Sequence, residues 1–292
     1  MPKVQNKTKA KVSKLKFSKV LWLADLSYPQ YNGGAERTDY VIKEAGKKLG
    51  LDIQDMHIAD ECDTNDYDLV VISNIHRWKD GVVSKMIEDT YTPIVFFSHD
   101  PLMHKWYPKA IKQAFCTVFM SPAHKKFYTR KLALGTHFIQ PHGLTDMDSW
   151  YSSEDREDIY LYIGDLNGYK GVQNVYKWAM DNPDKEVRLW GRHMAKFPFL
   201  LDNFKYYGWL DQDKLAETLS KAKYFLHLPE FVDPCPRMVT FAMMSGCEII
   251  GNENIGTFSY DWPWEDMDAV KKILKRAPRK FWKNINKHYE EY

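Results

Sequence analysis

The chain has 292 residues, of which 44% are hydrophobic and 27% are charged, and its formal net charge is +2. This length is too great for one small core and fits two α/β domains of ordinary size. The composition predicts a globular protein, no apolar run approaches the roughly 20 residues of a membrane span, and the small net charge leaves the class of partner open.

The start of the chain is strongly basic. Residues 1–17 contain no acidic residue and no apolar stretch of the kind that a signal peptide needs. Such a segment is typical of a solvated, disordered arm, and contact with nucleic acid or an anionic membrane surface is the alternative. We therefore predict a basic arm that contains Lys3, Lys7, Lys9, Lys11, Lys14 and Lys16.

The four cysteines, Cys62, Cys116, Cys235 and Cys247, form no C-x-x-C pair. This spacing argues against a zinc site or a disulfide framework and fits a protein of a reducing compartment. We therefore expect a cytoplasmic location, which is the host cytoplasm if the chain is viral, with peripheral attachment to a polyanion as the alternative.

In the first half of the chain, short apolar runs alternate with helical stretches. The run 19–25 predicts a buried strand, and a glycine pair then leads into a helix that Gly50 ends. Four more apolar runs are strand candidates, each followed by a helix or a loop: 67–74, 92–100, 115–121 and 136–143.

The same cycle restarts after residues 151–159, a polar and acidic segment typical of a linker. A strand, a glycine loop and a helix follow one another over 159–180, and 211–222 predicts a helix with Asp211 near its cap. Further strands are expected at 186–192, 204–210, 223–230 and 247–252, and the end of the chain is helical and basic.

Apolar strands that alternate with helices predict parallel sheets covered on both faces. We expect an α/β protein with two Rossmann-like, doubly wound domains at residues 18–150 and 158–260, which face each other across a cleft, and a helical tail at 261–292. Ligands of such sheets bind at the carboxyl ends of the strands, so the loops after the strands are the place to look for function.

A glycine loop follows the first strand of each predicted domain. Gly33 and Gly34 remove Cβ atoms where the backbone must approach a ligand, and the next helix offers free N–H groups to an anion. A tight turn is the structural alternative. The loop 164–171 contains three glycines and Lys170, whose charge suits a phosphate, although a solvated lysine is the alternative there.

The segment 229–250, PEFVDPCPRMVTFAMMSGCEII, joins a strand to a helix through a loop that three prolines stiffen. We expect the N-terminus of this helix to point into the cleft. Asp233 suits hydrogen bonds from sugar hydroxyls, and Arg237 suits a diphosphate because of its forked guanidinium. A helix cap and a surface ion pair are the respective alternatives.

The order of these motifs resembles the GT-B glycosyltransferases, in particular the large retaining, family 4-like group that includes sucrose and glycogen synthase-like and lipopolysaccharide-type enzymes. The resemblance covers residues 18–260 and rests on the glycine pair, FSHD at 97–100, GDLNGYKG at 164–171 and the segment 229–250. It implies transfer of a sugar from a nucleotide-sugar without a metal or another cofactor, and a C-terminal helix that returns to the first domain.

The resemblance also implies roles for individual residues. Gly33 and Gly34 match the glycine loop that touches the donor phosphate, and Lys170 matches the phosphate-binding lysine. His99 matches a position near the donor sugar and the leaving phosphate, and Asp233 matches the first of two glutamates, which contacts the donor sugar. We therefore predict His99 and Asp233 as the catalytic pair.

Two positions depart from the pattern of the family. Phe241 stands at the second glutamate, which normally holds the ribose hydroxyls, and Asp165 stands where an arginine is expected. Arg192 or Arg237 would then replace the missing cation. Three explanations of these departures stay open. The enzyme binds its donor through other residues, it uses an unusual donor, or it is a catalytically degenerate module that binds a nucleotide or nucleic acid. We expect a divergent but working hexosyl- or pentosyltransferase, because phosphate charge can be neutralised from several positions.

The acceptor is expected against the first domain, with Asp100, Lys105 and Trp106 as acceptor-side residues. The segment 104–131 interleaves lysines with aromatic residues, which suits a phosphate-rich acceptor, although solvated helix faces are the alternative. The acceptor candidates are an anionic glycan or lipid and a modified DNA base flipped out of the duplex, because this sequence is similar in style to viral DNA-modifying transferases.

Other chemistries have little support in the sequence. D-x-D pairs at 146–148, 211–213 and 266–268 are more typical of helix caps and solvated turns than of a Mn²⁺ or Mg²⁺ site. The histidines lack the spacing of metal ligands, no G-x-S-x-G elbow occurs, and the loop after the first strand lacks the G-x-G-x-x-G of dehydrogenases. We therefore predict that no metal is bound.

Overall fold

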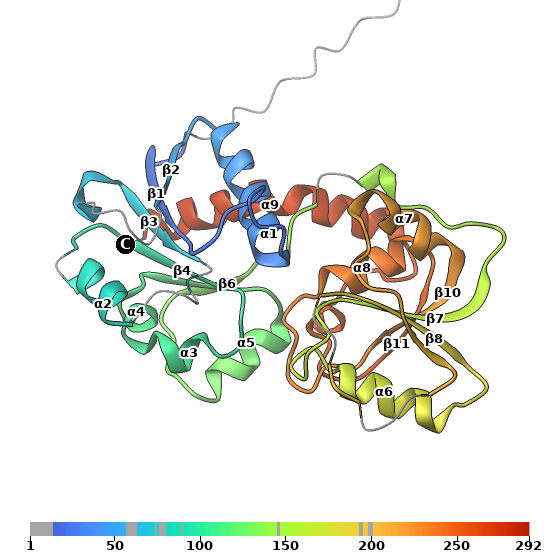
Figure 1. The fold of residues 1–292 in the computed structure, drawn as a ribbon. Helices are drawn as coiled ribbons and strands as arrows, with labels where there is room; N and C mark the ends of the chain where they lie inside the picture. Colours follow the sequence, from blue (N-terminus) through green and yellow to red (C-terminus); the bar gives the residue numbers. More distant parts are fainter. Residues whose placement is uncertain are drawn as a thin grey trace, which may run out of the picture.

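The computed structural model describes residues 14–56, 63–73, 75, 80–88, 90–144, 147–192, 195–197 and 201–291. Most of the predicted basic arm, Cys62 and the first aspartate of the pair at 146–148 lie outside the described residues. The chain folds into two lobes, each built on a parallel sheet (Figure 1). The α/β fold class with two doubly wound domains is thereby confirmed.

The first domain contains a six-stranded parallel sheet in the order β2-β1-β3-β4-β5-β6. Its strands are β1 (Lys19–Leu23), β2 (Asp52–Met56), β3 (Leu69–Ile72), β4 (Ile94–Ser98), β5 (Cys116–Phe119) and β6 (His137–Ile139). The three strands β3, β4 and β5 are buried at every position, which explains why their sequences are nearly unbroken apolar runs.

Helices cover both faces of this first sheet. They are α1 (Gly34–Lys47), α2 (Asp80–Glu88), α3 (Met103–Trp106), α4 (Pro108–Gln113) and α5 (Pro122–Thr129). One face packs against α2, α4 and α5, and the other packs against α1 and the C-terminal helix. A short 3-10 turn at Thr64–Asp66 precedes β3.

The sequence did not predict β2, which lies at the edge of the sheet. Its sequence DIQDM has no apolar run, and only Met56 is buried. The strand is defined by its parallel pairing with β1, from Lys19 opposite Asp52 to Leu23 opposite Met56. The sequence of an exposed edge strand shows little alternation of apolar and polar residues, so β2 is recognised only from its pairing with β1.

The second domain contains a five-stranded parallel sheet in the order β11-β10-β7-β8-β9. Its strands are β7 (Glu157–Ile163), β8 (Glu186–Trp190), β9 (Phe204–Tyr206), β10 (Ala222–His227) and β11 (Glu248–Gly251). Helix α6 (Val172–Asp181) covers one face, and α7 (Gln212–Lys221) and α8 (Arg237–Met244) cover the other. Two 3-10 turns, Met147–Ser149 and Gly256–Ser259, flank the domain.

The long helix α9 (Met267–Tyr289) ties the two domains together and runs across both lobes in Figure 1. Its first half buries Val270 and Leu274 in the core of the second domain, and its second half buries Phe281 and Trp282 in that of the first. The Trp282 indole donates a hydrogen bond of 2.8 Å to the Ile42 carbonyl in α1. The chain therefore ends on the first domain, as the resemblance implied.

A proline lies where α9 passes from one domain to the other. Pro278 is buried inside the helix and contacts the backbone at Gly143, where a Cβ atom would collide with the proline ring. The Gln140 side chain donates a hydrogen bond of 2.8 Å to the Ala277 carbonyl at the same crossing. Glycine at residue 143 thus permits the close approach of the interdomain connection to α9.

Candidate functional site

A cavity of about 390 Å³ lies between the two domains at the carboxyl ends of their strands. The first domain contributes the loop after β1 with the start of α1, and the loop after β4. The second domain contributes the loops after β7, β8 and β10 together with the start of α8. Of the predicted residues, the cavity is lined by Gly33, Gly34, His99, Asp100, Asp165, Lys170, Arg192, Asp233, Arg237 and Phe241.

The N-terminus of α1 forms one wall of the cavity. Gly33 is the N-cap residue in an extended conformation and makes no side-chain capping bond, and Gly34 is the first helical residue. Glu36 in the first turn is 5% exposed, and its carboxyl group folds back over Gly33, where it would collide with any Cβ atom. A side chain at residue 33 would therefore have to displace the Glu36 carboxylate from this position.

Arg237 reaches across the cavity from the start of α8 to the first domain. Its Nη1 donates a hydrogen bond of 3.1 Å to Thr38 Oγ1 in α1, and its Cδ lies 3.7 Å from where a Gly34 Cβ would stand. The guanidinium lies 5.6 Å from the centre of the Phe241 ring in the next turn of α8. One cation thus lies between the N-termini of two helices, both of which favour an anion.

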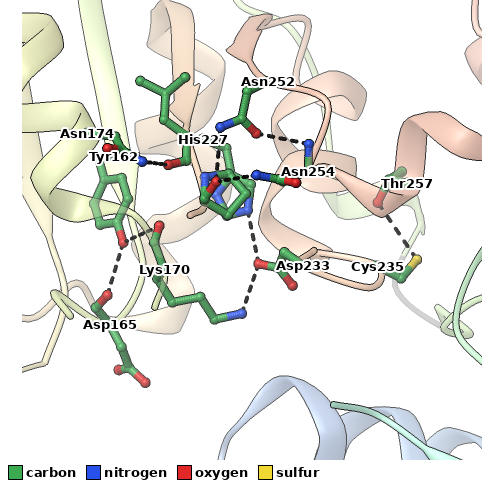
Figure 2. A network of polar contacts seen from close by, with 12 residues as sticks. Tyr162, Asp165, Lys170, Asn174, His227, Asp233, Cys235, Asn252, Asn254 and Thr257 are labelled. Carbon is green, nitrogen blue, oxygen red and sulfur yellow. Dashed lines mark hydrogen bonds and ion pairs between the residues drawn. The ribbon is translucent and has the colours of Figure 1, made fainter. Parts of the chain in front are cut away.

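Asp233 is the most strongly held carboxylate of the cavity (Figure 2). Its Oδ2 atom lies 2.9 Å from Lys170 Nζ and 3.0 Å from His227 Nε2, and the residue is 4% exposed. Burial opposes its ionisation, but the charge of Lys170 and the hydrogen bonds from His227 and Lys170 outweigh it, so that the pKa of Asp233 is lowered. For Lys170, burial likewise opposes the charge, but Asp233 raises its pKa overall. Both groups are therefore charged at neutral pH.

Tertiary contacts keep the Lys170 loop in place. The Tyr162 hydroxyl donates hydrogen bonds to the carbonyls of Asp165, at 3.0 Å, and of Lys170, at 3.5 Å (Figure 2). Gly171 has a φ of 76°, and a Cβ atom there would collide with the Leu228 carbonyl. Only glycine satisfies both conditions, so this loop can lie directly against the chain that follows β10.

The loop that carries Asp233 is held from β11. Asn252 Nδ2 and Asn254 Nδ2 donate hydrogen bonds of 3.0 and 3.1 Å to the Pro229 carbonyl (Figure 2). The backbone of Asp233 itself bridges to Ile255. Asp233 is therefore not a cap of α8, whose N-cap residue is Pro236. The loop positions the carboxylate toward Lys170 and His227.

Arg192 supplies a cation from the loop after β8. Its Nε lies 3.2 Å from Asp165 Oδ1, and its Nη1 donates a hydrogen bond of 3.4 Å to the Tyr31 hydroxyl of the first domain. The guanidinium also lies 5.6 Å from the centre of the exposed Trp209 ring. Asp165, which stands where the family has an arginine, thus holds an arginine from the neighbouring strand. That Arg192 replaces the missing cation stays a prediction.

His99 follows β4 and is held by a buried network. Its Nε2 lies 2.8 Å from Asp39 Oδ1 and 3.1 Å from Ser73 Oγ. Asp39 in α1 also accepts hydrogen bonds from Ser73, at 2.9 Å, and from the indole of Trp22, at 3.1 Å. The ring is therefore held in one orientation at the wall of the cavity, beside Asp100.

Phe241 is both a core residue and a wall of the cavity. Its ring stacks on Trp150 with centroids 4.0 Å apart and an interplanar angle of 11°, and the residue is 7% exposed. A second cavity, of about 410 Å³, lies on the other side of Phe241 and Arg237 and is also lined by Trp150, Tyr28 and Tyr40. An aromatic stack thus stands where a carboxylate for ribose hydroxyls would be expected.

Cys235 also lines the cavity, but its thiol is not available as a nucleophile. Its Sγ lies 3.1 Å from His142 Nδ1 and 3.8 Å from Thr257 Oγ1. Burial raises the pKa of the Cys235 thiol to about 11, and burial lowers the pKa of His142 well below its usual value. Both groups are therefore neutral at physiological pH, which disfavours a thiolate at Cys235.

Two of the three predicted acceptor-side residues lie apart from the cavity. Lys105 and Trp106 are on the short helix α3, both are exposed, and neither lines the cavity. Asp100 does line it, and its carboxylate accepts a hydrogen bond of 2.7 Å from the Leu102 backbone. A role for Lys105 and Trp106 toward an acceptor stays a prediction.

The D-x-D pairs occupy helix starts wherever they are described. Asp211 is the N-cap residue of α7, and Asp266 is that of α9, where its side chain accepts a hydrogen bond of 2.9 Å from the Ala269 backbone. Asp148 belongs to the 3-10 turn Met147–Ser149. Within the described part of the chain, no group of three His, Cys, Asp or Glu side chains is arranged to hold a metal ion.

Sequence reasoning missed several residues of the site. His227 and Asp39 hold the two predicted catalytic residues, and Tyr31 and Trp209 flank Arg192. His227 ends strand β10, so its position at the carboxyl end of a strand was the available signal. Asp39 lies in the middle of a helix, and nothing in its local sequence indicates that it faces His99.

The two facing parallel-sheet domains, the cavity between them and the returning helix define the GT-B fold. Similar solved structures include sucrose-phosphate synthase from Thermosynechococcus elongatus, with a TM-score of 0.65, 14% identity and 94% of each chain covered. HepE from Anabaena, in complex with UDP and glucose, has a TM-score of 0.61 at 14% identity over 94% of this chain and 98% of that chain.

A third similar structure is an alpha-glucosyltransferase in complex with UDP and a 13-mer DNA that contains an HMU base. It has a TM-score of 0.57 at 12% identity, with 94% of each chain covered. At such identities the likeness is one of fold, and it confirms the GT-B architecture expected from the sequence. No protein-family model and no curated protein sequence matches the chain. Among the described residues, no helix is both long and apolar enough to cross a membrane.

Proposed function

We propose that the protein is a glycosyltransferase that moves a sugar from a nucleoside diphosphate sugar to an acceptor, with retention and without a metal ion. The observation that carries the proposal is the cavity between the domains, where Arg237, Arg192 and Lys170 converge with the N-termini of α1 and α8. Lys170 and Arg192 each lie beside a carboxylate, Asp233 and Asp165 respectively. The attraction for a departing diphosphate therefore comes from the three cations together with the two helix N-termini.

The proposed chemistry is mainly electrostatic. As the bond between sugar and phosphate breaks, negative charge grows on the leaving diphosphate, and the three cations with the helix N–H groups stabilise it from fixed positions. The fixed geometry matters because these groups then need not reorient as the bond breaks. Two of the similar structures described above hold UDP, which makes a UDP-sugar the first donor to test.

Asp233 would orient the donor sugar through its hydroxyls. A carboxylate with a lowered pKa is a weak base, so its role is to accept hydrogen bonds rather than protons. His99, which Asp39 and Ser73 hold at the opposite wall, would contact the sugar or the leaving-group side. Retention rests on the resemblance to the retaining group. The cavity also contains Asp100, which accepts a hydrogen bond from the Leu102 backbone, and Asp165, which is paired with Arg192.

The acceptor in this proposal is polyanionic, either a modified DNA base or an anionic glycan or lipid. One similar structure holds DNA that contains an HMU base, which makes hydroxymethylated DNA the first acceptor to test. The competing proposal is a catalytically degenerate module that binds a nucleotide without turnover. Phe241 favours it, because the stacked ring cannot accept hydrogen bonds from ribose hydroxyls.

A thermal unfolding screen with UDP-, GDP- and dTDP-linked sugars tests the proposal. A ligand at 100 times its Kd stabilises the folded state by about 2.7 kcal/mol, which is readily seen as a higher unfolding midpoint. The stabilising donor is then incubated with and without hydroxymethylated DNA, and release of the nucleoside diphosphate is measured. Stabilisation with release supports the transferase, stabilisation without any release supports the degenerate module, and no stabilisation by any donor contradicts both.

A further inference from the structure

Helix α9 carries a one-sided stripe of cations on its solvent face. Seven exposed lysine and arginine residues follow one another at spacings of one, three or four residues, which places them on one side of the helix, opposite its buried residues. At a rise of 1.5 Å per residue they extend over about 22 Å. We call this set the α9 stripe: Lys272, Lys275, Arg276, Arg279, Lys280, Lys283 and Lys287.

No acidic residue interrupts the α9 stripe. The sequence from residue 269 to residue 289 contains no aspartate or glutamate, and no member of the stripe forms an ion pair within the described part of the chain. Helix α7 shows the ordinary arrangement, where Lys221 Nζ lies 2.5 Å from Glu217 Oε1 one turn away. The solvent face of α9 therefore differs from that of α7 in lacking carboxylates between its cations.

This arrangement disfavours the helix in isolation. Like charges four residues apart repel each other, and the α9 stripe contains five such pairs: 272–276, 275–279, 276–280, 279–283 and 283–287. The chain as a whole has 41 basic and 39 acidic residues, so the stripe is a local concentration rather than a consequence of a basic protein. Solvated faces usually mix both signs, and a row of one sign marks a surface that attracts an opposite charge.

A second basic segment joins the α9 stripe from the other end of the chain. The Lys16 backbone donates a hydrogen bond of 2.6 Å to Asn286 Oδ1 in α9. Phe17 packs against Trp282 and Tyr289, with ring centroids 6.1 and 5.3 Å apart. These contacts bring the exposed Lys14 and Lys16 to the same end of α9, so two basic elements far apart in sequence converge.

We propose that the α9 stripe binds the phosphate backbone of a nucleic-acid duplex without regard to its sequence. With both strands counted, a duplex presents one negative charge for about each 1.7 Å of its axis, a dense array of phosphates that suits a run of cations along one helix. Among the described residues, no large exposed apolar side chain lies on α9. The helix therefore has no exposed apolar side chain that could insert into a membrane. No member of the stripe lines the interdomain cavity, so this surface is separate from the proposed transfer site.

The experiment compares two full-length variants with equal net charge. The stripe variant carries Lys272→Gln, Arg276→Gln, Lys280→Gln and Lys283→Gln. The control variant carries Lys48→Gln, Lys177→Gln, Lys214→Gln and Lys223→Gln, four exposed lysines scattered over both domains. Binding to a fluorescent 20-base-pair DNA duplex is measured by anisotropy over a range of salt concentrations, and vesicles with and without anionic lipid are tested in parallel.

We expect the slope of log K against log salt to become shallower by about 3 to 4 in the stripe variant and to stay near wild type in the control. Duplex affinity of the stripe variant should fall at least roughly tenfold at low salt. The unfolding midpoint should stay the same or rise, because repulsion within the helix is relieved. This readout shows that weaker binding does not come from unfolding.

Three results would overturn the inference. Equal losses in both variants would show that only net charge matters, and an unchanged stripe variant would make the stripe a solvated face. Stripe-dependent binding to anionic vesicles but not to the duplex would assign the surface to membranes. Donor hydrolysis without DNA is expected to be the same in both variants and wild type, so failure of the proposed transfer reaction is detected separately.

Discussion

The two helix N-termini that meet at the interdomain cavity differ in what lies beside them. Helix α1 begins with two glycines and buries the acidic Glu36 in its first turn. Helix α8 begins with Pro236 and Arg237 and has no acidic residue in its first turn. Both ends carry the partial positive charge of a helix N-terminus, but only the end of α8 adds a full positive charge and no negative one.

This difference assigns separate tasks to the two domains. At the start of α1, the first domain provides glycine backbone together with Arg37 and the acidic Glu36 of the first turn. The second domain provides Lys170, Arg192 and Arg237, which line the cavity and which we propose hold the diphosphate. Variants of the second domain should therefore affect donor use much more than variants at the start of α1.

Lys170→Ala should have the largest effect. Loss of one preorganised charge is expected to lower the rate of donor hydrolysis or transfer by roughly tens to a thousandfold, measured as released nucleoside diphosphate. Lys177→Ala, an exposed lysine on α6, serves as the matched control and should behave as wild type. Wild-type rates in Lys170→Ala would remove this lysine from the proposed mechanism.

Phe241→Glu tests whether the aromatic stack is needed for the fold. We expect a folded protein with a lower unfolding midpoint, because the stack on Trp150 is lost while the new carboxylate can reach Arg237 at the wall of the cavity. The loss for the truncation Phe241→Ala should be on the order of 3 kcal/mol. Phe225→Glu, which places a charge on a completely buried residue of β10, is the contrast and should not fold. Equal damage in Phe241→Glu and Phe225→Glu would make Phe241 purely a core residue.

Arg237→Gln should weaken the binding of a nucleoside diphosphate by about tenfold, as expected for one charge-assisted contact. Arg37→Gln removes a cation of the first domain that also lines the cavity but is engaged by Asn32 and lies 5.1 Å from the centre of the Tyr28 ring. Calorimetric titration of both variants compares the two domains directly. A larger loss in Arg37→Gln would reverse the assignment of charge to the second domain.

Glu36→Gln should have the smallest effect on donor use and a distinct effect on stability. Burial raises the pKa of Glu36, and the charge of Asp39 adds to this, although the hydrogen bond from its own backbone N–H opposes it. The folded state thus binds the Glu36 carboxyl proton more tightly than the unfolded state does. The stability of the folded state therefore falls as the pH rises from 4.5, the ordinary pKa of a glutamate, through the raised pKa of the folded state.

The glutamine variant should therefore unfold at a higher temperature than wild type at pH 7, and the difference should shrink toward pH 4. Thermal unfolding followed by circular dichroism over this pH range measures both quantities. A Glu36→Gln variant that is less stable than wild type at pH 7 would show that the ionised carboxylate stabilises the start of α1. The N-terminus of α1 would then be more positive than that of α8.

The sequence was sufficient for the architecture because apolar runs and glycine loops are local signals. Every strand of the second sheet and five of the six strands of the first overlap a run that the sequence predicts as a strand. The exception, β2, is an exposed edge strand whose sequence carries no such run. The proline-rich loop and the helix that begins at Arg237 were likewise evident, since proline fixes φ and an apolar helical run follows.

The sequence alone determined that two doubly wound domains would present glycine loops, Lys170, Asp233 and Arg237 at strand ends. Only the tertiary structure decided which of these residues meet. Lys170 and Asp233 are 63 residues apart, and Arg237 and Thr38 are 199 residues apart, yet each pair is in contact. Such pairings depend on how the strands of a sheet and the two domains pack, and the pattern within a short segment holds no information about a partner that lies far away in the chain.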